Sequence, residues 1–205
     1  MISRPTVFLV DDDVAVTRAI SSLVTMMQLR VLTFASAEAV LSIGAEEFKH
    51  DGCLVLDIRL PGMSGLELQK SLRERACELP VIIISGHADV PLTVEAMSRG
   101  ALTVLEKPFG LETIKQTILQ AIELDHQRRE RARERDLVRE RLNNLTPREQ
   151  EVLALIPLGL TNKEIAAQLH LTLRAIEDRR SRLMRRLGVR SIAELLLLVQ
   201  QAKAA

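Results

Sequence analysis

Five short runs of continuously apolar, largely β-branched residues recur through the first half of the chain. Because they do not alternate with polar residues, they are typical of strands buried on both faces, in a parallel sheet between layers of helices. Segments with helical spacing of apolar residues separate them, most clearly between residues 16 and 27. This order predicts an α/β doubly wound domain with a five-stranded parallel sheet. The runs are TVFLV (6–10), VLTF (31–34), CLVL (53–56), VIII (81–84) and LTVL (102–105).

The rest of the chain has a different pattern. Residues 125–141 are rich in Arg and Glu and contain neither Gly nor Pro, which favours a solvated helical linker, with disorder as the alternative. From residue 145 onward, caps and stops mark four helices, beginning with a capping box at Thr146 and Glu149. A short helix, a tight turn and a basic helix predict an all-α helix-turn-helix domain. The predicted divisions are 1–122, 123–143 and 144–205.

Charge is distributed unevenly along the sequence. Residues 1–120 hold 11 basic and 15 acidic side chains, whereas residues 145–205 hold 10 basic and 6 acidic ones. The two halves should therefore have different partners. The amino terminus lacks the apolar run of a signal peptide, no stretch is long and apolar enough for a membrane span, and the two cysteines lack metal-ligand spacing. We therefore expect a soluble, cytoplasmic protein with no membrane partner.

Polar side chains stand where the predicted strands end. Asp57 follows the third run, the triplet 11–13 the first, Ser85 the fourth and Lys107 the fifth. Carboxyl ends of parallel strands share one edge of a sheet, so these side chains should meet there. Clustered carboxylates repel one another unless a cation joins them, and hard oxygen ligands suit Mg²⁺. With a lysine and a hydroxyl the set suits phosphoryl transfer to a carboxylate. Each residue taken alone is better explained as a cap, a turn residue or a surface charge, and only their joint position at strand ends favours the functional interpretation.

These strand ends lie in four motifs, which are DDD (11–13), LDIRLPGMSG (56–65), SGHAD (85–89) and EKPF (106–109). Through them, residues 5–122 resemble the receiver domain of two-component response regulators, a flavodoxin-like fold. The resemblance implies that Asp57 is the phosphoacceptor, which takes a phosphoryl group from a phosphohistidine on a sensor histidine kinase.

The resemblance also implies the roles of the neighbouring residues. Ser85 and Lys107 would bind the phosphoryl oxygens, and the peptide bond between Lys107 and Pro108 would be cis. Many receivers carry Phe or Tyr at the position of Val104, so the usual aromatic rotamer switch lacks its ring here. Phosphorylated receivers of this kind pair through helix four and strand five, which implies a homodimer. The implied ligands of Mg²⁺ are Asp11, Asp12, Asp57 and the backbone carbonyl of Arg59.

The basic helix predicted at residues 173–187 carries six arginines and can lie in the major groove of double-stranded DNA. Residues 145–199 resemble the LuxR-type four-helix DNA-binding domain, and the whole chain resembles regulators of the FixJ and NarL type. Ala175 and Arg179 depart from the residues common in that family. The residues expected at DNA are Lys163, Arg174, Glu177, Asp178, Arg180, Ser181, Arg182 and Arg185.

The expected function is that of a response regulator, and not of an enzyme. Phosphorylation of Asp57 would promote dimerisation and binding to operator DNA, with RNA polymerase as a further possible partner. One alternative is a Mg²⁺-dependent phosphatase that uses Asp57 as its nucleophile. Such hydrolases need a second carboxylate where this chain has Arg59. The other alternative is a regulator that works independently of phosphorylation, which Val104 and the acidic residues of the basic helix keep open.

Overall fold

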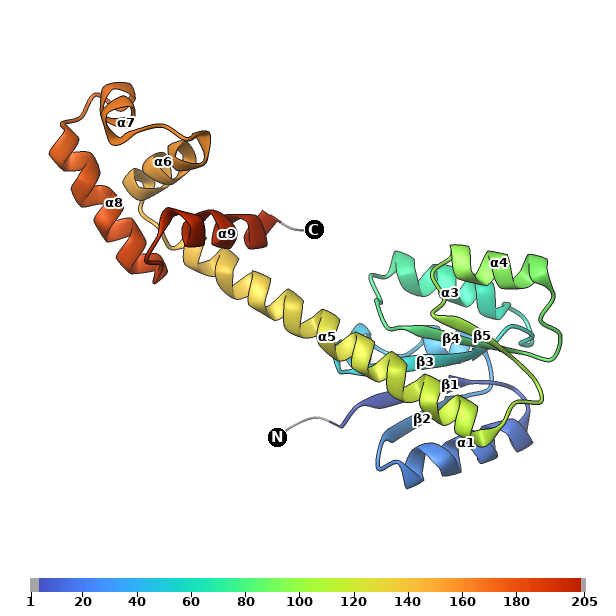
Figure 1. The fold of residues 1–205 in the computed structure, drawn as a ribbon. Coiled ribbons are helices and arrows are strands. Elements are labelled where there is room, and N and C mark those ends of the chain that lie inside the picture. The colour runs from blue at the N-terminus through green and yellow to red at the C-terminus, as the bar shows by residue number, and fades with distance from the viewer. Residues whose placement is uncertain (1–3, 204–205) are drawn as a thin grey trace. The chain divides into compact units, whose positions relative to one another are not determined.

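The computed structural model describes residues 4–203, apart from the side chains of Ala45 and Lys203. The chain forms two compact units, Met1–Arg129 and Glu130–Ala205 (Figure 1). The first unit contains a five-stranded sheet in the order β2-β1-β3-β4-β5, with every neighbouring pair parallel, as the sequence predicted. The strands are β1 Thr6–Val10, β2 Arg30–Phe34, β3 Gly52–Asp57, β4 Val81–Ser85 and β5 Thr103–Glu106.

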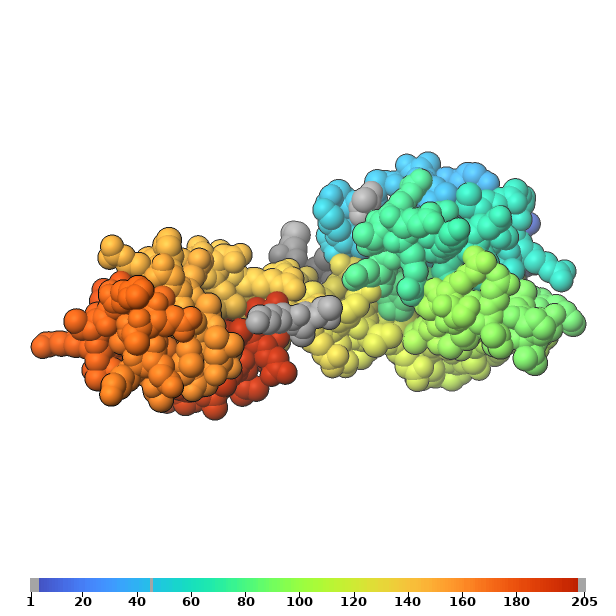
Figure 2. All heavy atoms as spheres, turned by 90° about the horizontal axis from the view of Figure 1, so that it is seen from above, coloured from blue at the N-terminus to red at the C-terminus, as the bar shows by residue number. Residues whose placement is uncertain are grey.

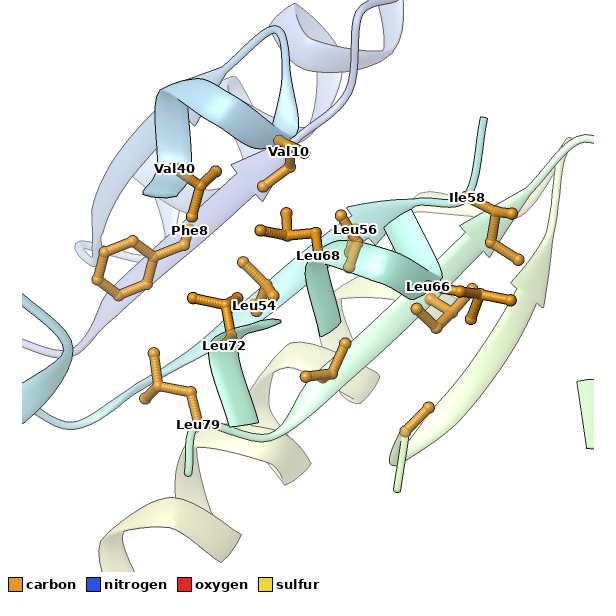
Figure 3. Packing of buried hydrophobic residues seen from close by; sticks show 14 of the residues in the cluster. Phe8, Val10, Val40, Leu54, Leu56, Ile58, Leu66, Leu68, Leu72 and Leu79 are labelled. Carbon is orange, nitrogen blue, oxygen red and sulfur yellow. The ribbon is translucent and has the colours of Figure 1, made fainter. Parts of the chain in front are cut away.

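Helices cover both faces of this sheet (Figure 1). One core cluster lies between the sheet and α2, α3 and α4, and the other lies between the sheet and α1 and α5. In Figure 3, Leu54 and Leu56 of β3 lie close to Leu68 and Leu72 of α3. Full burial of each such side chain stabilises the fold by about 1.5–3 kcal/mol. The helices are α1 Val14–Met26, α2 Ala37–Leu41, the 3₁₀ helix η1 Ala45–Lys49, α3 Gly65–Glu74, α4 Val90–Ser98 and α5 Leu111–Asn143.

Two glycines allow close backbone approach around β3. A Cβ at Gly65, the first residue of α3, would lie 2.1 Å from the carbonyl oxygen of Asp57. A Cβ at Gly52, where β3 begins, would lie 2.1 Å from the carbonyl oxygen of Thr6. Both distances are far inside van der Waals contact, so a larger residue would displace the backbone. Gly65 thereby lets α3 begin directly against the end of the strand that carries Asp57.

The predicted linker is helical. α5 runs without interruption from Leu111 to Asn143, so its last part, residues 130–143, belongs to the second unit. The structure groups residues 123–129 with the first unit, and the predicted divisions after residues 122 and 143 remain predictions. Within the described residues, every helix is too short or too polar to cross a lipid bilayer.

The second unit is helical and contains the predicted helix-turn-helix, formed by α7 and α8. Capping boxes begin α6 at Thr146 and α7 at Thr161. Gly159 and Gly188 take left-handed φ angles of 75° and 71° where η2 and α8 end, as helix-terminating glycines commonly do. Buried aliphatic side chains from α6, α7, α8 and α9 contribute to its core. The helices are α6 Pro147–Leu155, the 3₁₀ helix η2 Ile156–Leu158, α7 Asn162–Gln168, α8 Leu173–Leu187 and α9 Ile192–Lys203.

Candidate phosphorylation site and nucleic-acid interface

Asp11, Asp57 and Lys107 meet at the carboxyl edge of the sheet, although they are far apart in sequence. Asp57 is the last residue of β3, Asp11 directly follows β1 and Lys107 directly follows β5. The two carboxylates are buried, with Asp11 2% and Asp57 6% exposed. Lys107 Nζ lies 2.7 Å from Asp11 Oδ2 and 2.5 Å from Asp57 Oδ2, so one ammonium group bridges both carboxylates. The predicted cis peptide bond between Lys107 and Pro108 is present.

The bridge affects the ionisation of its members. Burial raises the pKa of Asp11, although the hydrogen bonds from Lys107 and from the backbone N–H of Asp13 oppose that effect. For Lys107, burial alone would lower the pKa, but the hydrogen bonds and charges of Asp11 and Asp57 together raise it. Lys107 therefore stays cationic in ordinary buffers and stabilises negative charge at this edge.

The carboxylates also suit a divalent cation. One oxygen each from Asp11, Asp12 and Asp57 lies within 4.8 Å of the other two. Three carboxylates and one lysine leave an excess of negative charge, and hard oxygen ligands at this spacing match the preference of Mg²⁺. Arg59 is exposed, and its backbone N–H donates to Asp57 Oδ1 over 2.9 Å, which holds the following loop against the site. The donor set therefore fits the metal that the sequence implied.

Ser85 lies at the end of β4, beside β3, and only 1% of it is exposed. Its hydroxyl donates to the carbonyl oxygen of His87 over 2.9 Å and accepts from the His87 N–H over 3.2 Å. Among the described residues, no hydrogen bond connects Ser85 to Asp57. Binding a phosphoryl oxygen would require the hydroxyl to exchange the His87 carbonyl for the new acceptor. Sequence reasoning did not assign a role to His87, although it stands inside the SGHAD motif.

The six arginines of α8 fall into two groups. Three of them make contacts to other parts of the second unit. Arg179 lies 3.7 Å from Glu151, and Arg186 lies 2.9 Å from Glu149. Arg180, the third member of this group, donates to the side-chain amide oxygen of Asn162, the first residue of α7.

The other three arginines are exposed and extend from the surface of α8. Within the described residues, Arg174 and Arg185 take part in no ion pair, and Arg182 Nε donates to the backbone carbonyl of Asp178 over 3.3 Å. Three further expected DNA contacts, Glu177, Asp178 and Ser181, are exposed on the same helix, and Lys163 is exposed on α7. Of the expected set, Arg180 is thus held by a neighbouring side chain, and the others are accessible to a ligand.

Glu149 links the start of α6 to α8. It accepts from the backbone N–H and the hydroxyl of Thr146, each over 2.8 Å, and pairs with Arg186. The backbone N–H of Thr146 lowers the pKa of Glu149, burial opposes this, and the Thr146 hydroxyl and Arg186 lower it further. A lowered folded-state pKa gives stability that is present above the unfolded pKa and is lost as pH falls through the folded value.

We expect Glu149→Gln to destabilise the start of α6 by about 1 kcal/mol at pH 7, the usual size of a helix-cap effect. Amide hydrogen exchange over residues 147–155 of the full chain should then be about fivefold faster than in the native protein. The difference should shrink as pH falls below 4.5, the ordinary pKa of the group, because the native carboxylate then becomes protonated.

Glu151→Gln provides a matched control on the same helix, because its exposed carboxylate lies 3.7 Å from Arg179 and makes no cap. Exchange in this variant should stay within about twofold of native, as expected for a surface ion pair. If the two substitutions speed exchange equally, or if the Glu149→Gln effect on exchange persists unchanged at low pH, the Glu149 carboxylate does not stabilise the start of α6.

Comparisons with known proteins match each of the two units to a protein family. Residues 7–119 match the response regulator receiver domain, and residues 143–199 match the bacterial regulatory proteins of the luxR family. The chain is 37% identical to Nodulation protein W of Bradyrhizobium diazoefficiens, over 95% of this chain and 85% of that protein. It is 36% identical to the transcriptional regulatory protein FixJ of Rhizobium meliloti, over 93% of this chain and 92% of that protein.

Solved structures give the same result. The response regulator StyR matches with a TM-score of 0.84 and 39% identity, over 97% of this chain and 100% of that one. Full-length FixJ from B. japonicum matches with a TM-score of 0.59 and 33% identity, over 98% of each chain. With a receiver fold, an acidic edge bridged by a lysine and a helix-turn-helix unit, the chain belongs to the two-component response regulators that join a receiver domain to a LuxR-type DNA-binding domain.

Proposed function

We propose that this response regulator is controlled by phosphorylation of Asp57, with a sensor histidine kinase as the donor. The observation that carries the proposal is the bridge from Lys107 to both Asp57 and Asp11 at a buried strand edge. A buried carboxylate with a cation beside it can accept a phosphoryl group, because the cation offsets charge that the new group brings. In the transfer, an Asp57 oxygen bonds to phosphorus while the bond from phosphorus to the kinase imidazole nitrogen breaks, and that nitrogen keeps the electron pair.

The surrounding side chains have separate tasks in this proposal. Lys107 Nζ exchanges one carboxylate for a phosphoryl oxygen, and Ser85 donates its hydroxyl to another. Mg²⁺, when bound, lowers the repulsion between the phosphoryl oxygens and the acidic edge. Its proposed ligands are the carboxylates of Asp11, Asp12 and Asp57 together with the backbone carbonyl of Arg59.

Asp12→Asn is expected to weaken Mg²⁺ binding at least tenfold. Asp12 is exposed, so the substitution removes one negative charge from the cluster without leaving a buried group unpaired. At an effective dielectric constant of about 20 the attraction between charges about 4 Å apart exceeds the 1.4 kcal/mol that corresponds to a tenfold change. Isothermal titration calorimetry with MgCl₂ measures the change.

Asp136→Asn, an exposed substitution on α5 of the second unit, is the control and should leave Mg²⁺ affinity within about twofold of native. If Asp12→Asn binds Mg²⁺ as tightly as the native protein does, Asp12 is not a ligand.

Phosphorylation is proposed to favour a homodimer through α4 and β5. α4 lies on the surface of the first unit (green in Figure 2), and it exposes Val90 by 76%, Val94 by 61% and Met97 by 45%. Neighbouring exposed apolar side chains on one short helix are typical of an interaction surface. Two second units brought together would bind two half-sites of an operator with α8 in the major groove, and RNA polymerase is the further partner through which transcription would change.

The proposal is tested on the full chain with acetyl phosphate and MgCl₂. Intact mass spectrometry should show one phosphoryl group, sedimentation should show a shift toward dimer, and affinity for a duplex selected from a random pool should rise by about 5–150-fold. If the chain is phosphorylated but its affinity for DNA does not change, regulation is independent of phosphorylation. Continuous release of phosphate from small phosphoesters would instead support the phosphatase alternative.

A further inference from the structure

Asp125 is a buried carboxylate at the opposite edge of the sheet from the phosphorylation site. It lies on α5, its side chain is 0% exposed, and it belongs to neither the acidic edge nor the expected DNA contacts. Its Oδ2 accepts the backbone N–H of Gly52 over 3.1 Å, and it pairs with Arg128 Nη2 at 2.5 Å and Arg129 Nε at 2.7 Å. A buried charge is costly unless it is fully paired, and these contacts provide that pairing.

The two arginines extend this contact onto the backbone of the first unit. Arg129 donates through Nη1 to the carbonyl of Lys49 over 2.6 Å and through Nη2 to that of Phe48 over 2.9 Å. Arg128 donates to the carbonyl of Glu78. The planar guanidinium has five N–H donors, so a single arginine can bind a carboxylate and two carbonyls together. We refer to Asp125, Arg128 and Arg129 as the α5 anchor.

The anchor is attached to the strands that carry the proposed phosphoryl-binding residues. Gly52 is the first residue of β3, which ends at Asp57, and Glu78 precedes β4, which ends at Ser85. The contact between Gly52 and the Thr6 carbonyl leaves no room for a side chain, so the N–H that Asp125 accepts is held in place. The anchor and the phosphorylation site therefore lie at opposite ends of the same two strands.

Two ion pairs further along α5 are exposed and connect residues of the helix to one another. Glu130 with Arg133 and Asp136 with Arg139 are exposed pairs three residues apart on the helix itself. Exposed pairs of this kind contribute little to the free energy of folding. The division of the chain into two units falls immediately after Arg129, the last member of the anchor. Attachment of the linker to the first unit is thus concentrated in its first two turns.

We propose that the α5 anchor fixes the beginning of the linker helix to the receiver, and that this attachment transmits the phosphorylation state of Asp57 to the linker. The second half of the inference rests on the proposed function. Without the anchor, the receiver would still accept a phosphoryl group, since every group at the acidic edge is unchanged. The linker, however, would no longer follow the conformation of β3 and β4.

Asp125→Ala tests the attachment, with Asp125→Asn as a milder variant that keeps a neutral acceptor for the Gly52 N–H. In Asp125→Ala we expect hydrogen exchange of the Gly52 amide and of residues 125–129 to be at least about tenfold faster, with a smaller increase in Asp125→Asn. The matched control is Asp136→Ala, which removes an exposed aspartate from the same helix and should leave exchange in these segments within about twofold of native. If exchange at Gly52 is unchanged in both Asp125 variants, the α5 anchor does not fix the linker helix to the receiver.

The same variants test transmission. After acetyl phosphate treatment, phosphoryl incorporation at Asp57 should stay within about twofold of native, while the phosphorylation-dependent gain in DNA affinity should fall to less than about a third of the native gain. If Asp125 variants show faster exchange at residues 125–129 but keep the full phosphorylation-dependent gain in DNA affinity, the anchor holds the helix but does not transmit the phosphorylation state. A native protein that shows no incorporation, or no gain, would overturn the proposed function and transmission together, while the exchange result would still decide the anchor. Should Asp125→Ala fail to fold, the Asp125→Asn measurements decide both halves.

Discussion

Asp57→Asn is expected to reduce phosphorylation by acetyl phosphate at least about a thousandfold, the size typical of losing a nucleophile. The amide that replaces the carboxylate is neutral and cannot form the acyl phosphate. The fold should survive, because Lys107 keeps its 2.7 Å contact with Asp11 and a side-chain oxygen remains to accept the Arg59 N–H. Intact mass spectrometry gives the phosphorylated fraction over time, and circular dichroism reports the fold.

Asp13→Asn is the matched control for this substitution. Asp13 is an exposed aspartate in the same triplet, and it caps α1 by accepting the Ala15 N–H over 2.8 Å. Asparagine caps helices about as well as aspartate does, so phosphorylation should stay within about twofold of native. If Asp57→Asn is phosphorylated at the native rate, the acceptor is another residue and the proposed function fails. If both variants lose phosphorylation equally, the loss reflects general damage to the edge.

The strands could be predicted because their burial leaves a simple pattern. Residues covered on both faces of a parallel sheet are apolar throughout, as in β1, β3 and β4. Burial on both faces was wrong for β2 and β5, which lie at the two edges of the sheet and are only partly buried. Each run still marks a strand to within a residue or two, and β2 begins at Arg30 instead of residue 31. The acidic edge could be predicted for a related reason. Parallel strands all end at the same edge, which predicts that Asp11, Asp57 and Lys107 lie along it, and the strand order with the long lysine side chain brings them into contact.

Contacts that depend on side-chain direction could not be predicted in this way. Helical spacing from Ile118 and Ala121 places Asp125 on the buried face of α5, but it does not show which groups the carboxylate pairs with. Its partner Gly52 is 73 residues away in sequence. The pair of Arg180 and Asn162 is similar, because helical spacing alone does not show which arginine of α8 turns back toward α7.

The second large effect is expected from Arg174, Arg182 and Arg185, replaced together by alanine. Affinity for duplex DNA should fall by about a thousandfold or more, since each of the three contacts to a charged group contributes about 1.5 kcal/mol or more. The slope of log affinity against log salt should become shallower by about 0.9 for each phosphate contact that is lost. Fluorescence anisotropy with a labelled duplex at several salt concentrations measures both quantities.

A second triple variant of equal charge serves as the control. Arg131, Arg133 and Arg141 are exposed on α5, and their replacement by alanine removes the same charge from the same unit. If α8 lies in the major groove, this control should change affinity by less than about tenfold, through long-range electrostatics that salt screens. Equal losses in the two triples would show that binding depends only on overall charge, and would contradict the placement of α8.

The division among the α8 arginines strengthens this test. Arg186 pairs with Glu149, the residue that completes the cap of α6, so replacing Arg186 removes a contact within the second unit and should lower stability as well as affinity. The surface pair of Arg179 with Glu151 should contribute little to stability. Arg174 and Arg185 have no ion-pair partner among the described residues, so their loss should lower affinity and leave thermal unfolding unchanged. A DNA-reading surface is expected to separate these two effects, because groups kept free for phosphates and bases contribute little to the fold. If the exposed arginines instead lower stability and leave the salt slope unchanged, α8 is a structural helix and DNA binds elsewhere.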